Sequence, residues 1–198
     1  MVLSVYGDSV SGNCLKVKWV LDRLKIDYRW VETSVVDGRT RTPEFLGINP
    51  AGQVPAVRLE DGRSLAQSNA IIGYFAEGTD LVPDDRYERA RMYEWMFWEQ
   101  YSHEPYIAVR RFQMFYLGRP DAELDPKLFE RGAAALGRME FGLEGRDWLA
   151  GDRLSLADVA LVAYTRVAHQ GGFDLGLYPR VKAWVARVEG ELGLPPAA

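Results

Sequence analysis

The chain has 198 residues, of which 47% are hydrophobic and 26% charged, and its formal net charge is −4. This composition is typical of a globular protein with a sizeable core, and the absence of a basic cluster argues against nucleic acid as a main partner. The single cysteine, Cys14, excludes a disulfide framework within the chain and a cysteine-rich zinc site, and we expect no metal. The N-terminus has no signal-peptide pattern and no apolar run reaches the length of a membrane span, so we expect a cytoplasmic protein with no membrane partner.

The first residues alternate between strand and helix patterns. Residues 2–6 form a short apolar run that predicts a strand, and residues 28–33 predict a second one. Between them, apolar side chains recur at helical spacing and predict a helix whose apolar face begins at Cys14. A strand, a helix and a strand in this order predict that the two strands are parallel.

Turn-forming residues divide the next part of the chain. Thr42-Pro43 predicts the start of a short helix, because proline suits the first helical position. Residues 54–59 and the segment around Ser64-Leu65 flank an Asp-Gly pair, which predicts a hairpin. A helix from about Gln67 to Glu77 completes the order strand, helix, strand, helix, strand, strand, helix.

The second part of the chain predicts only helices. Residues 78–86 contain glycine, proline and several acids, so we expect a linker between a first domain, residues 1–77, and a second domain, residues 87–198. Residues 87–117 predict a long aromatic-rich helix with a kink at Pro105. Further helix starts are predicted at Asp125-Pro126, at the capping box Ser155-Leu156-Ala157-Asp158 with Leu154 and Val159 as its hydrophobic staple, and at Tyr178-Pro179.

Three motifs resemble those of the cytosolic glutathione transferases, and the resemblance covers nearly the whole chain. They are Gln53-Val54-Pro55 before a strand, Gln67-Ser68 at a helix start, and Gly151 to Asp158, which resembles the family's buried capping box. The segment Trp95 to Pro105 resembles a helix of bacterial members. The resemblance implies an α/β thioredoxin-like N-terminal domain followed by an all-α C-terminal domain, with glutathione as cosubstrate and a homodimer as the assembly.

The resemblance also assigns glutathione-binding roles to residues of the first domain. A cis peptide bond between Val54 and Pro55 would present the backbone of Val54 to the cysteinyl part of glutathione, as an added strand does. Ser68 would hold the γ-glutamyl carboxylate at a helix N-terminus, where the helix dipole favours an anion. Gln67 would bind the γ-glutamyl end through its amide, and Gln53 would reach the glycyl carboxylate.

Ser11 is the candidate catalytic residue. A free thiol has a pKa of about 8.5, so activating glutathione means stabilising its thiolate, and a helix N-terminus and a hydroxyl can each supply about 1 kcal/mol. Aligned by the following helix, Ser11 falls where theta- and zeta-like transferases carry serine. Asn13 could donate a second hydrogen bond to the sulfur, and Cys14 is best explained as a small buried hydrophobe. Tyr6, near the catalytic tyrosine position of alpha-, mu- and pi-like enzymes, is the alternative.

The second substrate would be a small hydrophobic electrophile, and the resemblance implies a pocket for it between the two domains. The candidate lining residues are Tyr101, His103, Tyr106 and Arg110. Arg39 and Arg41 could assist glutathione binding, but solvated surface charges explain them better.

We therefore expect a bacterial, serine-type glutathione transferase that conjugates the glutathione thiolate to small electrophiles. Three alternatives stay open: a non-catalytic glutathione-binding or regulatory protein on the same fold, a zeta-like glutathione-dependent isomerase, and a dehalogenase or reductase. The sequence does not separate them, because acceptor specificity depends on the variable helical pocket rather than on the fold.

Overall fold

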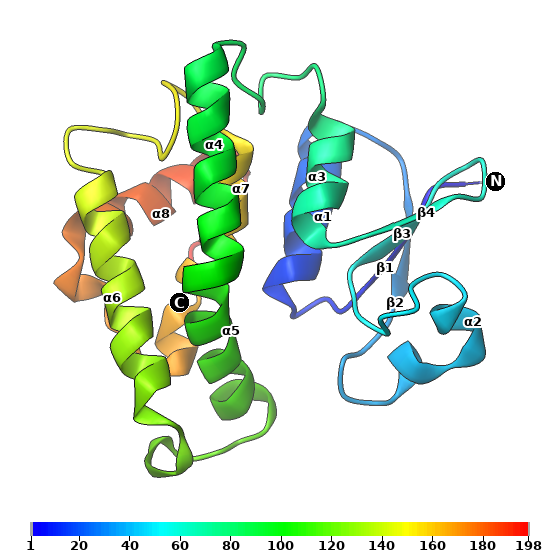
Figure 1. Cartoon of the computed structure of the whole chain (residues 1–198), viewed down its shortest axis with the longest axis horizontal. Helices are drawn as coiled ribbons and strands as arrows, with labels where there is room; N and C mark the ends of the chain where they lie inside the picture. The colour runs from blue at the N-terminus through cyan, green and yellow to red at the C-terminus, as the bar shows by residue number, and fades with distance from the viewer. Residues whose placement is uncertain (1, 198) are drawn as a thin grey trace. The chain divides into compact units, whose positions relative to one another are not determined.

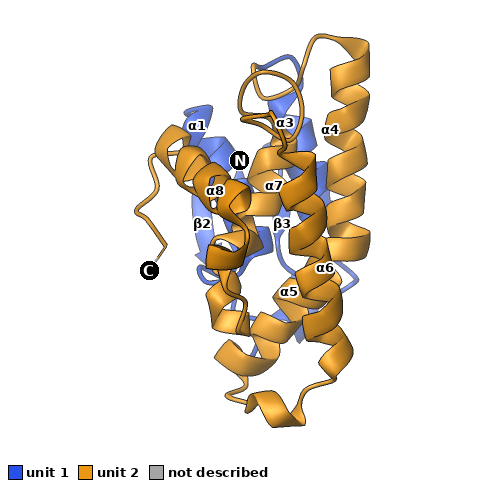
Figure 2. Ribbon diagram, turned by 90° about the vertical axis from the view of Figure 1, so that its left-hand side faces the viewer, with its two compact units in different colours: residues 1–79 blue, residues 80–198 orange. Residues whose placement is uncertain are grey.

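The computed structural model describes residues 2–197, which divide into two compact units. The division falls between Thr79 and Asp80, so that the first unit carries the mixed sheet and the second is helical (Figure 2). We call them unit 1 and unit 2. This is the predicted combination of a thioredoxin-like α/β part and an all-α part.

Unit 1 is built on a four-stranded sheet with the strand order β2-β1-β3-β4 (Figure 1). β1 pairs in parallel with β2 and antiparallel with β3, and β3 and β4 form a hairpin. The predicted Asp-Gly turn closes that hairpin, with Gly62 at a φ of 88° that suits glycine. The bounds of the strands are β1 Ser4–Gly7, β2 Arg29–Glu32, β3 Ala56–Arg58 and β4 Ser64–Ala66.

Helices α1 (Gly12–Arg23) and α3 (Ser68–Ala76) of unit 1 lie side by side (Figure 1). The close approach of α1 to β1 depends on Gly7, because a Cβ at this position would lie 3.1 Å from Cβ of Cys14 and 2.5 Å from the Trp30 ring. The short helix α2 (Pro43–Leu46) starts where Thr42-Pro43 predicts it, with the Thr42 hydroxyl accepting the N–H of Phe45.

The described part of unit 2, residues 80–197, contains five α-helices joined by turns and by short π-helical and 3-10 segments. They are α4 Arg86–Trp98, α5 Glu104–Arg111, α6 Pro126–Gly142, α7 Leu156–Thr165 and α8 Pro179–Glu191. Every residue of α7 is buried, so this helix forms the centre of the unit. Across residues 2–197, none of the helices combines the length and the apolar character that crossing a membrane requires.

The long aromatic-rich helix continues past Pro105, but with an irregular turn. A π-helical segment, Glu99–His103, follows α4 directly, and Pro105 lies in the first turn of α5. Proline has no N–H to donate to the carbonyl four residues earlier, and a wider turn accommodates that loss. A second π-helical segment, Phe112–Tyr116, ends this stretch.

Residues of the expected linker are packed rather than loose. Leu81 is fully buried, and its carbonyl accepts a 3.0 Å hydrogen bond from the N–H of Leu156. Asp85 then caps α4 by accepting the N–H of Glu88. This segment therefore joins unit 2 through its side chains and its backbone.

The predicted capping box of α7 is present, and its acid does more than cap the helix. The fully buried carboxylate of Asp158 accepts hydrogen bonds from the N–H and the hydroxyl of Ser155 at 2.9 and 2.8 Å. It also accepts the N–H of Leu149 at 3.0 Å and the indole N–H of Trp184 at 2.8 Å. One side chain thus ties the start of α7 to α8 and to the preceding loop.

Candidate functional site

Ser11 is the N-cap residue of α1, directly after the turn that follows β1. Its backbone is extended, with φ −74° and ψ 122°, and its carbonyl accepts the N–H groups of Cys14 and Leu15 at 3.0 and 2.9 Å. Its hydroxyl accepts no N–H from the first turn, and that turn contains no acidic residue. Because the helix dipole leaves partial positive charge at this end, the position suits an anion.

Cys14 lies in the core of unit 1 and is fully buried, as expected for a small hydrophobe. Burial raises the pKa of its thiol to about 12, against weaker opposing hydrogen bonds to the sulfur from the Asp8 backbone and the Ser11 side chain. The thiol of Cys14 is therefore protonated throughout the neutral range, and the protein does not supply a thiolate of its own here.

Asn13 and Ser68 bring the starts of two helices together. Ser68 is the first residue of α3 and is almost fully buried, and its hydroxyl donates a 3.2 Å hydrogen bond to Oδ1 of Asn13 in the first turn of α1. Both residues were predicted to bind glutathione, but their mutual bond was not predicted. The bond connects the anion-favouring ends of α1 and α3.

Gln67, the N-cap of α3, has an unusual backbone. Its φ is 70° and its ψ is 112°, in the half of conformational space that L-residues rarely adopt. Strained residues of this kind cluster at functional sites. The side chain of Gln67 is exposed and caps no helix N–H. The sequence held no signal for this strain, since glutamine has no preference for positive φ.

The turn before β3 contains the expected cis peptide bond between Val54 and Pro55. Asn49 shapes this turn: its Nδ2 donates to the carbonyl of Gln53 at 2.7 Å, and its Oδ1 accepts the N–H of Ala51 at 3.1 Å. The side chain of Gln53 is exposed. Asparagine commonly shapes turns through its side-chain amide in this way.

Tyr6 packs against α2. Its ring meets that of Phe45 edge-on, with centroids 6.1 Å apart. Because side chains alternate along a strand, Tyr6 points to the opposite face of the sheet from Gly7, which lies against Cys14 of α1. This placement supports a packing role for Tyr6.

Arg39 and Arg41 hold the loop between β2 and α2. The exposed Arg39 pairs with Asp37 at 2.8 Å and donates to the carbonyl of Glu32 at 3.4 Å. Arg41 donates to the carbonyl of Ala51 at 3.4 Å. Both arginines are surface residues with local structural contacts.

Two of the four candidate electrophile contacts are buried inside unit 2. His103 is fully buried, and its Nε2 lies 2.9 Å from the hydroxyl of Thr165. Arg110 is 3% exposed, donates to the carbonyl of Gly171 at 2.6 Å and pairs with Asp121. These contacts assign both side chains a structural role within the helical unit.

The other two candidates are accessible. Tyr101 is 84% exposed. Tyr106 is half-buried, with the guanidinium of Arg131 5.8 Å from the centre of its ring. Aromatic rings at accessible positions can contact an apolar ligand.

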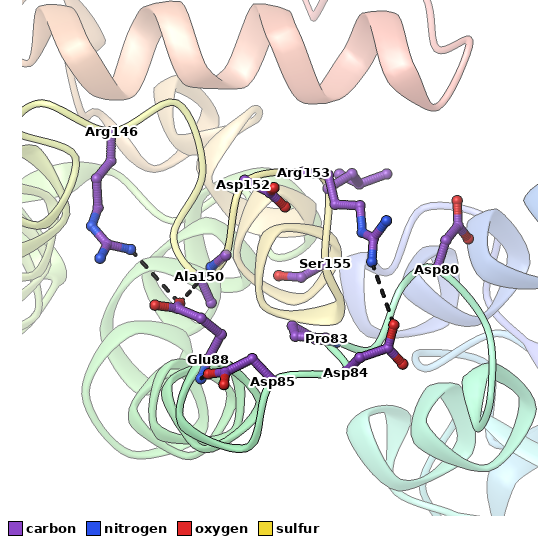
Figure 3. A pocket seen from close by; sticks show the side chains of 12 residues that line it. Asp80, Pro83, Asp84, Asp85, Glu88, Arg146, Ala150, Asp152, Arg153 and Ser155 are labelled. Atoms are coloured by element: carbon purple, nitrogen blue, oxygen red, sulfur yellow. Dashed lines mark hydrogen bonds and ion pairs between the residues drawn. The ribbon is translucent and has the colours of Figure 1, made fainter.

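A pocket of about 410 Å³ lies in unit 2, under the turn that precedes α7 (Figure 3). It contains none of the candidate site residues, and four of its charged groups form two ion pairs. Glu88 accepts the N–H of Gly151 at 2.6 Å and faces Arg146, and Arg153 faces Asp84. Although carboxylates line this pocket, no group of three or more His, Cys, Asp or Glu side chains within residues 2–197 is placed to hold a metal ion.

Comparison with known families and proteins gives matches along most of the chain. Residues 10–77 match the model of the glutathione S-transferase N-terminal domain, and residues 95–191 match that of the C-terminal domain. The chain is 32% identical to glutathione S-transferase 3 of Zea mays over 194 residues, which is 92% of this chain and 86% of the relative. It is 30% identical to the disulfide-bond oxidoreductase YfcG of Escherichia coli over 184 residues, with 87% and 84% covered.

Solved structures match the chain at higher sequence identity than these two relatives. A glutathione S-transferase from Pseudomonas fluorescens superposes with a TM-score of 0.92 at 45% identity, covering 96% of this chain and 95% of the other. One from Xanthobacter autotrophicus gives 0.90 at 45% identity, covering 99% and 95%. The fold expected from the motifs is confirmed by these matches.

Proposed function

Since the chain belongs to the glutathione transferase family, we propose that it conjugates the thiolate of glutathione to small electrophiles in the cytoplasm, in a detoxification role. The observation that carries the proposal is the hydrogen bond from Ser68 to Asn13, which brings the N-termini of α1 and α3 together in unit 1. Glutathione offers negative charge at both its γ-glutamyl carboxylate and its thiolate. Two adjoining helix N-termini complement that charge distribution.

In the proposed complex, unit 1 binds the tripeptide along its length. The backbone of Val54 before the cis-proline pairs with the cysteinyl backbone of glutathione. Ser68 and the first N–H groups of α3 bind the γ-glutamyl carboxylate, and Gln67 binds the same end through its exposed amide. Gln53 reaches the glycyl carboxylate.

The hydroxyl of Ser11 stabilises the thiolate of glutathione, with Asn13 as a second donor. Ser11 also lies beside the sulfur of Cys14, so the two sulfurs compete for its proton. Cys14 is protonated and neutral, whereas the substrate sulfur is an anion, and hydrogen bonds to charged acceptors are about twice as strong. The Ser11 hydroxyl therefore donates its hydrogen bond to the bound thiolate rather than to Cys14.

The chemical step needs no general base on the protein. The thiol proton passes to solvent when glutathione ionises, and the sulfur then forms a bond to an electrophilic carbon. The leaving group departs with its electron pair, or an addition product takes a proton from water. Tyr101 and Tyr106, the two accessible members of the candidate set, are the proposed contacts to the apolar part of the electrophile.

Replacing Ser11 tests the proposal. Ser11→Ala should lower kcat about tenfold or more, because each loss of about 1.4 kcal/mol in transition-state stabilisation costs one factor of ten. The affinity for S-hexylglutathione, which has no free thiol, should stay unchanged. Ser11→Thr keeps the hydroxyl and should retain most of the activity. Unchanged turnover in Ser11→Ala would contradict the assignment.

One relative favours a second candidate function. The similarity to a protein named disulfide-bond oxidoreductase suggests glutathione-dependent disulfide reduction. In this chain such a reaction would use the thiolate of glutathione alone, because Cys14 is buried and protonated. Assays with a model disulfide and with a model aryl halide, run side by side, separate the two reactions. Retention on glutathione resin with neither activity would indicate a binding protein.

We propose a homodimer that uses an aromatic row on α4, formed by Tyr93 and Phe97. These two residues lie about one helical turn apart, are 39% and 74% exposed, and have ring centroids 6.4 Å apart. Exposed aromatic residues in a row are typical of interfaces. Phe97→Glu should convert the dimer to a monomer in analytical ultracentrifugation. A variant that stays dimeric would exclude this row as the interface.

A further inference from the structure

The turn that places Ser11 is held by the side chain at its first position. Asp8 is 5% exposed, and its Oδ1 accepts the N–H of Val10 at 2.9 Å. Its Oδ2 accepts the N–H of Val35, which lies 27 residues further along the chain, at 3.1 Å. Its backbone carbonyl accepts the N–H of Ser11 at 3.1 Å. Asp8 therefore binds both the turn and the loop that follows β2.

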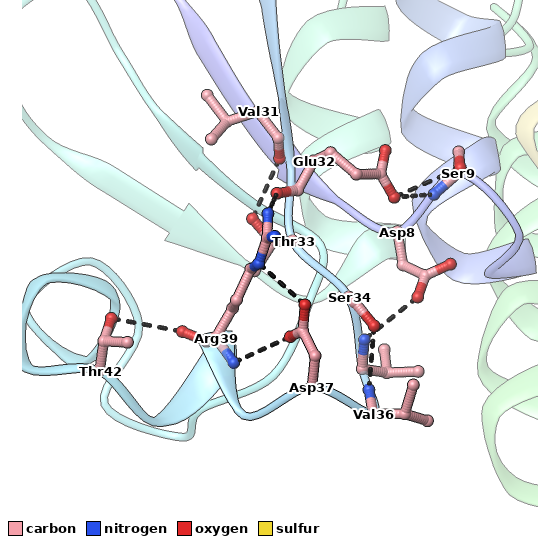
Figure 4. Close-up of polar contacts among 11 residues, drawn as sticks. Asp8, Ser9, Val31, Glu32, Thr33, Ser34, Val36, Asp37, Arg39 and Thr42 are labelled. Carbon is pink, nitrogen blue, oxygen red and sulfur yellow. Dashed lines mark hydrogen bonds and ion pairs between the residues drawn. The ribbon is translucent and has the colours of Figure 1, made fainter.

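A second carboxylate holds the same turn through Ser9. Glu32, the last residue of β2, accepts the N–H and the hydroxyl of Ser9 at Oε1, at 2.9 and 3.3 Å. Its Oε2 accepts the indole N–H of Trp30 at 2.7 Å, which fixes the direction of the carboxylate. Figure 4 shows Glu32 reaching toward Ser9, and Asp8 reaching toward the loop that follows β2.

Together these two residues accept the backbone N–H groups of Ser9, Val10 and Ser11. The N–H of Ser9 goes to Glu32, that of Val10 to the carboxylate of Asp8, and that of Ser11 to the carbonyl of Asp8. A backbone whose donors are all engaged has few alternative conformations, because each change leaves a donor unsatisfied. The Cα of Ser11 is thus held at one position relative to the sheet.

Charge does not explain why carboxylates stand here. The negative charges of Asp8 and Glu32 act against ionisation of the neighbouring sulfur of Cys14, although burial is the larger effect on its pKa. The same charges would act against any thiolate bound near Ser11. What these side chains contribute is therefore the geometry of the turn.

We propose that Asp8 and Glu32 are positioning residues that set the distance between the Ser11 hydroxyl and the sulfur of glutathione. This inference rests on the proposed function of Ser11. Loss of either carboxylate lets the turn relax, and small displacements of a catalytic group are costly, since about 1 Å can reduce a rate by up to about 100-fold. Binding of the tripeptide through Val54 and Ser68 does not involve the turn.

Two variants of Asp8 distinguish the effect of the position of its carboxylate on kcat from the effect of its charge. Asp8→Asn removes the charge and one of the two acceptor oxygens, whereas Asp8→Glu keeps the charge and moves the carboxylate by one methylene. Both should lower kcat about tenfold, within the range that misplacement produces, and leave the dissociation constant of S-hexylglutathione unchanged. If charge were the important property, Asp8→Asn would raise kcat and Asp8→Glu would leave it unchanged, and that result would overturn the proposal.

A double-mutant cycle tests whether Asp8 acts through Ser11. In the Ser11→Ala background, Asp8→Asn should cause no further loss of kcat, because the group that it positions is absent. An additional tenfold loss would show an independent role and contradict the inference. Asp61→Asn is the control: like Asp8, Asp61 accepts two hydrogen bonds through its carboxylate, but both come from Arg63 in the hairpin of unit 1, so its replacement should not change kcat.

The same cycle distinguishes a failure of the proposed role of Ser11 from a failure of the positioning inference. If Ser11→Ala itself leaves kcat unchanged, the proposed role of Ser11 is wrong. If Ser11→Ala lowers kcat but neither Asp8 variant does, only the positioning inference is wrong. Should the Asp8 variants fail to fold, Glu32→Ala replaces them, because Glu32 is exposed and its removal leaves only Ser9 and Trp30 to be solvated. A loss of kcat of several-fold is expected for it, and an unchanged kcat overturns the inference.

Discussion

The hydroxyl of Ser68 donates a hydrogen bond to Oδ1 of Asn13 across 55 residues of sequence, at 3.2 Å. Ser68 is the first residue of α3, and Asn13 is the second residue of α1. The bond orients the amide of Asn13 so that its oxygen faces α3. In the proposed complex, the γ-glutamyl carboxylate of glutathione lies at the start of α3 and its thiolate at the start of α1.

Removing either partner of this bond should weaken glutathione binding. Ser68→Ala and Asn13→Ala should each raise the dissociation constant of S-hexylglutathione about fivefold, the equivalent of about 1 kcal/mol for one hydrogen bond. Because the two side chains share that bond, the double variant should lose less than the sum of the two losses. Isothermal titration calorimetry measures all four affinities, with the exposed Ser64→Ala as control. Strict additivity would show that the two residues act separately.

Two variants should distinguish the backbone strain at Gln67 from the role of its side-chain amide in binding glutathione. Gln67→Gly removes both the amide and the strain of a positive φ, whereas Gln67→Ala removes only the amide. Both variants should bind S-hexylglutathione more weakly than the parent protein. Gln67→Gly should unfold at a higher temperature than Gln67→Ala, because positive φ costs a residue with a Cβ about 1 kcal/mol. Equal melting temperatures in scanning calorimetry would argue against strain at this position.

Cys14 should resist thiol reagents in the native protein. Its pKa of about 12 leaves only about one thiol in 10⁴ ionised at pH 8, and its full burial blocks access. Reaction with a maleimide should be negligible in native buffer at pH 8 and fast in guanidinium chloride, where the pKa returns toward its ordinary value. Raising the pH from 7 to 9 should not give the native protein measurable reactivity. Rapid stoichiometric labelling of the native chain would contradict this assignment.

Asp158 should be important for stability rather than for catalysis. Asp158→Ala leaves several buried donors without an acceptor, at about 1–3 kcal/mol for each donor, so the melting temperature should fall steeply. Asp158→Asn keeps one acceptor oxygen and should be destabilised less. For molecules that remain folded, kcat at a low temperature should match the parent protein. An Asp158→Ala variant as stable as the parent protein would show that these hydrogen bonds contribute little to the free energy of unfolding.

Features that depend on neighbours along the chain could be predicted from the sequence alone. Thr42-Pro43, Asp125-Pro126 and Ser155–Asp158 each start a helix as predicted, because a cap and its partner lie within three residues of each other. The Asp-Gly turn between β3 and β4 and the order of strands and helices in unit 1 follow from similarly local patterns.

Contacts between groups that are distant in the sequence could not be predicted in this way, because they depend on the tertiary fold. His103 and Arg110 were candidate pocket residues together with the accessible Tyr101, but packing within unit 2 buries both, because their partners Thr165 and Gly171 come from segments about 60 residues away. The bond from Asp8 to Val35 likewise depends on β1 and β2 lying side by side. Hydrogen bonds across such separations depend on the path of the whole chain, and no local propensity encodes that path.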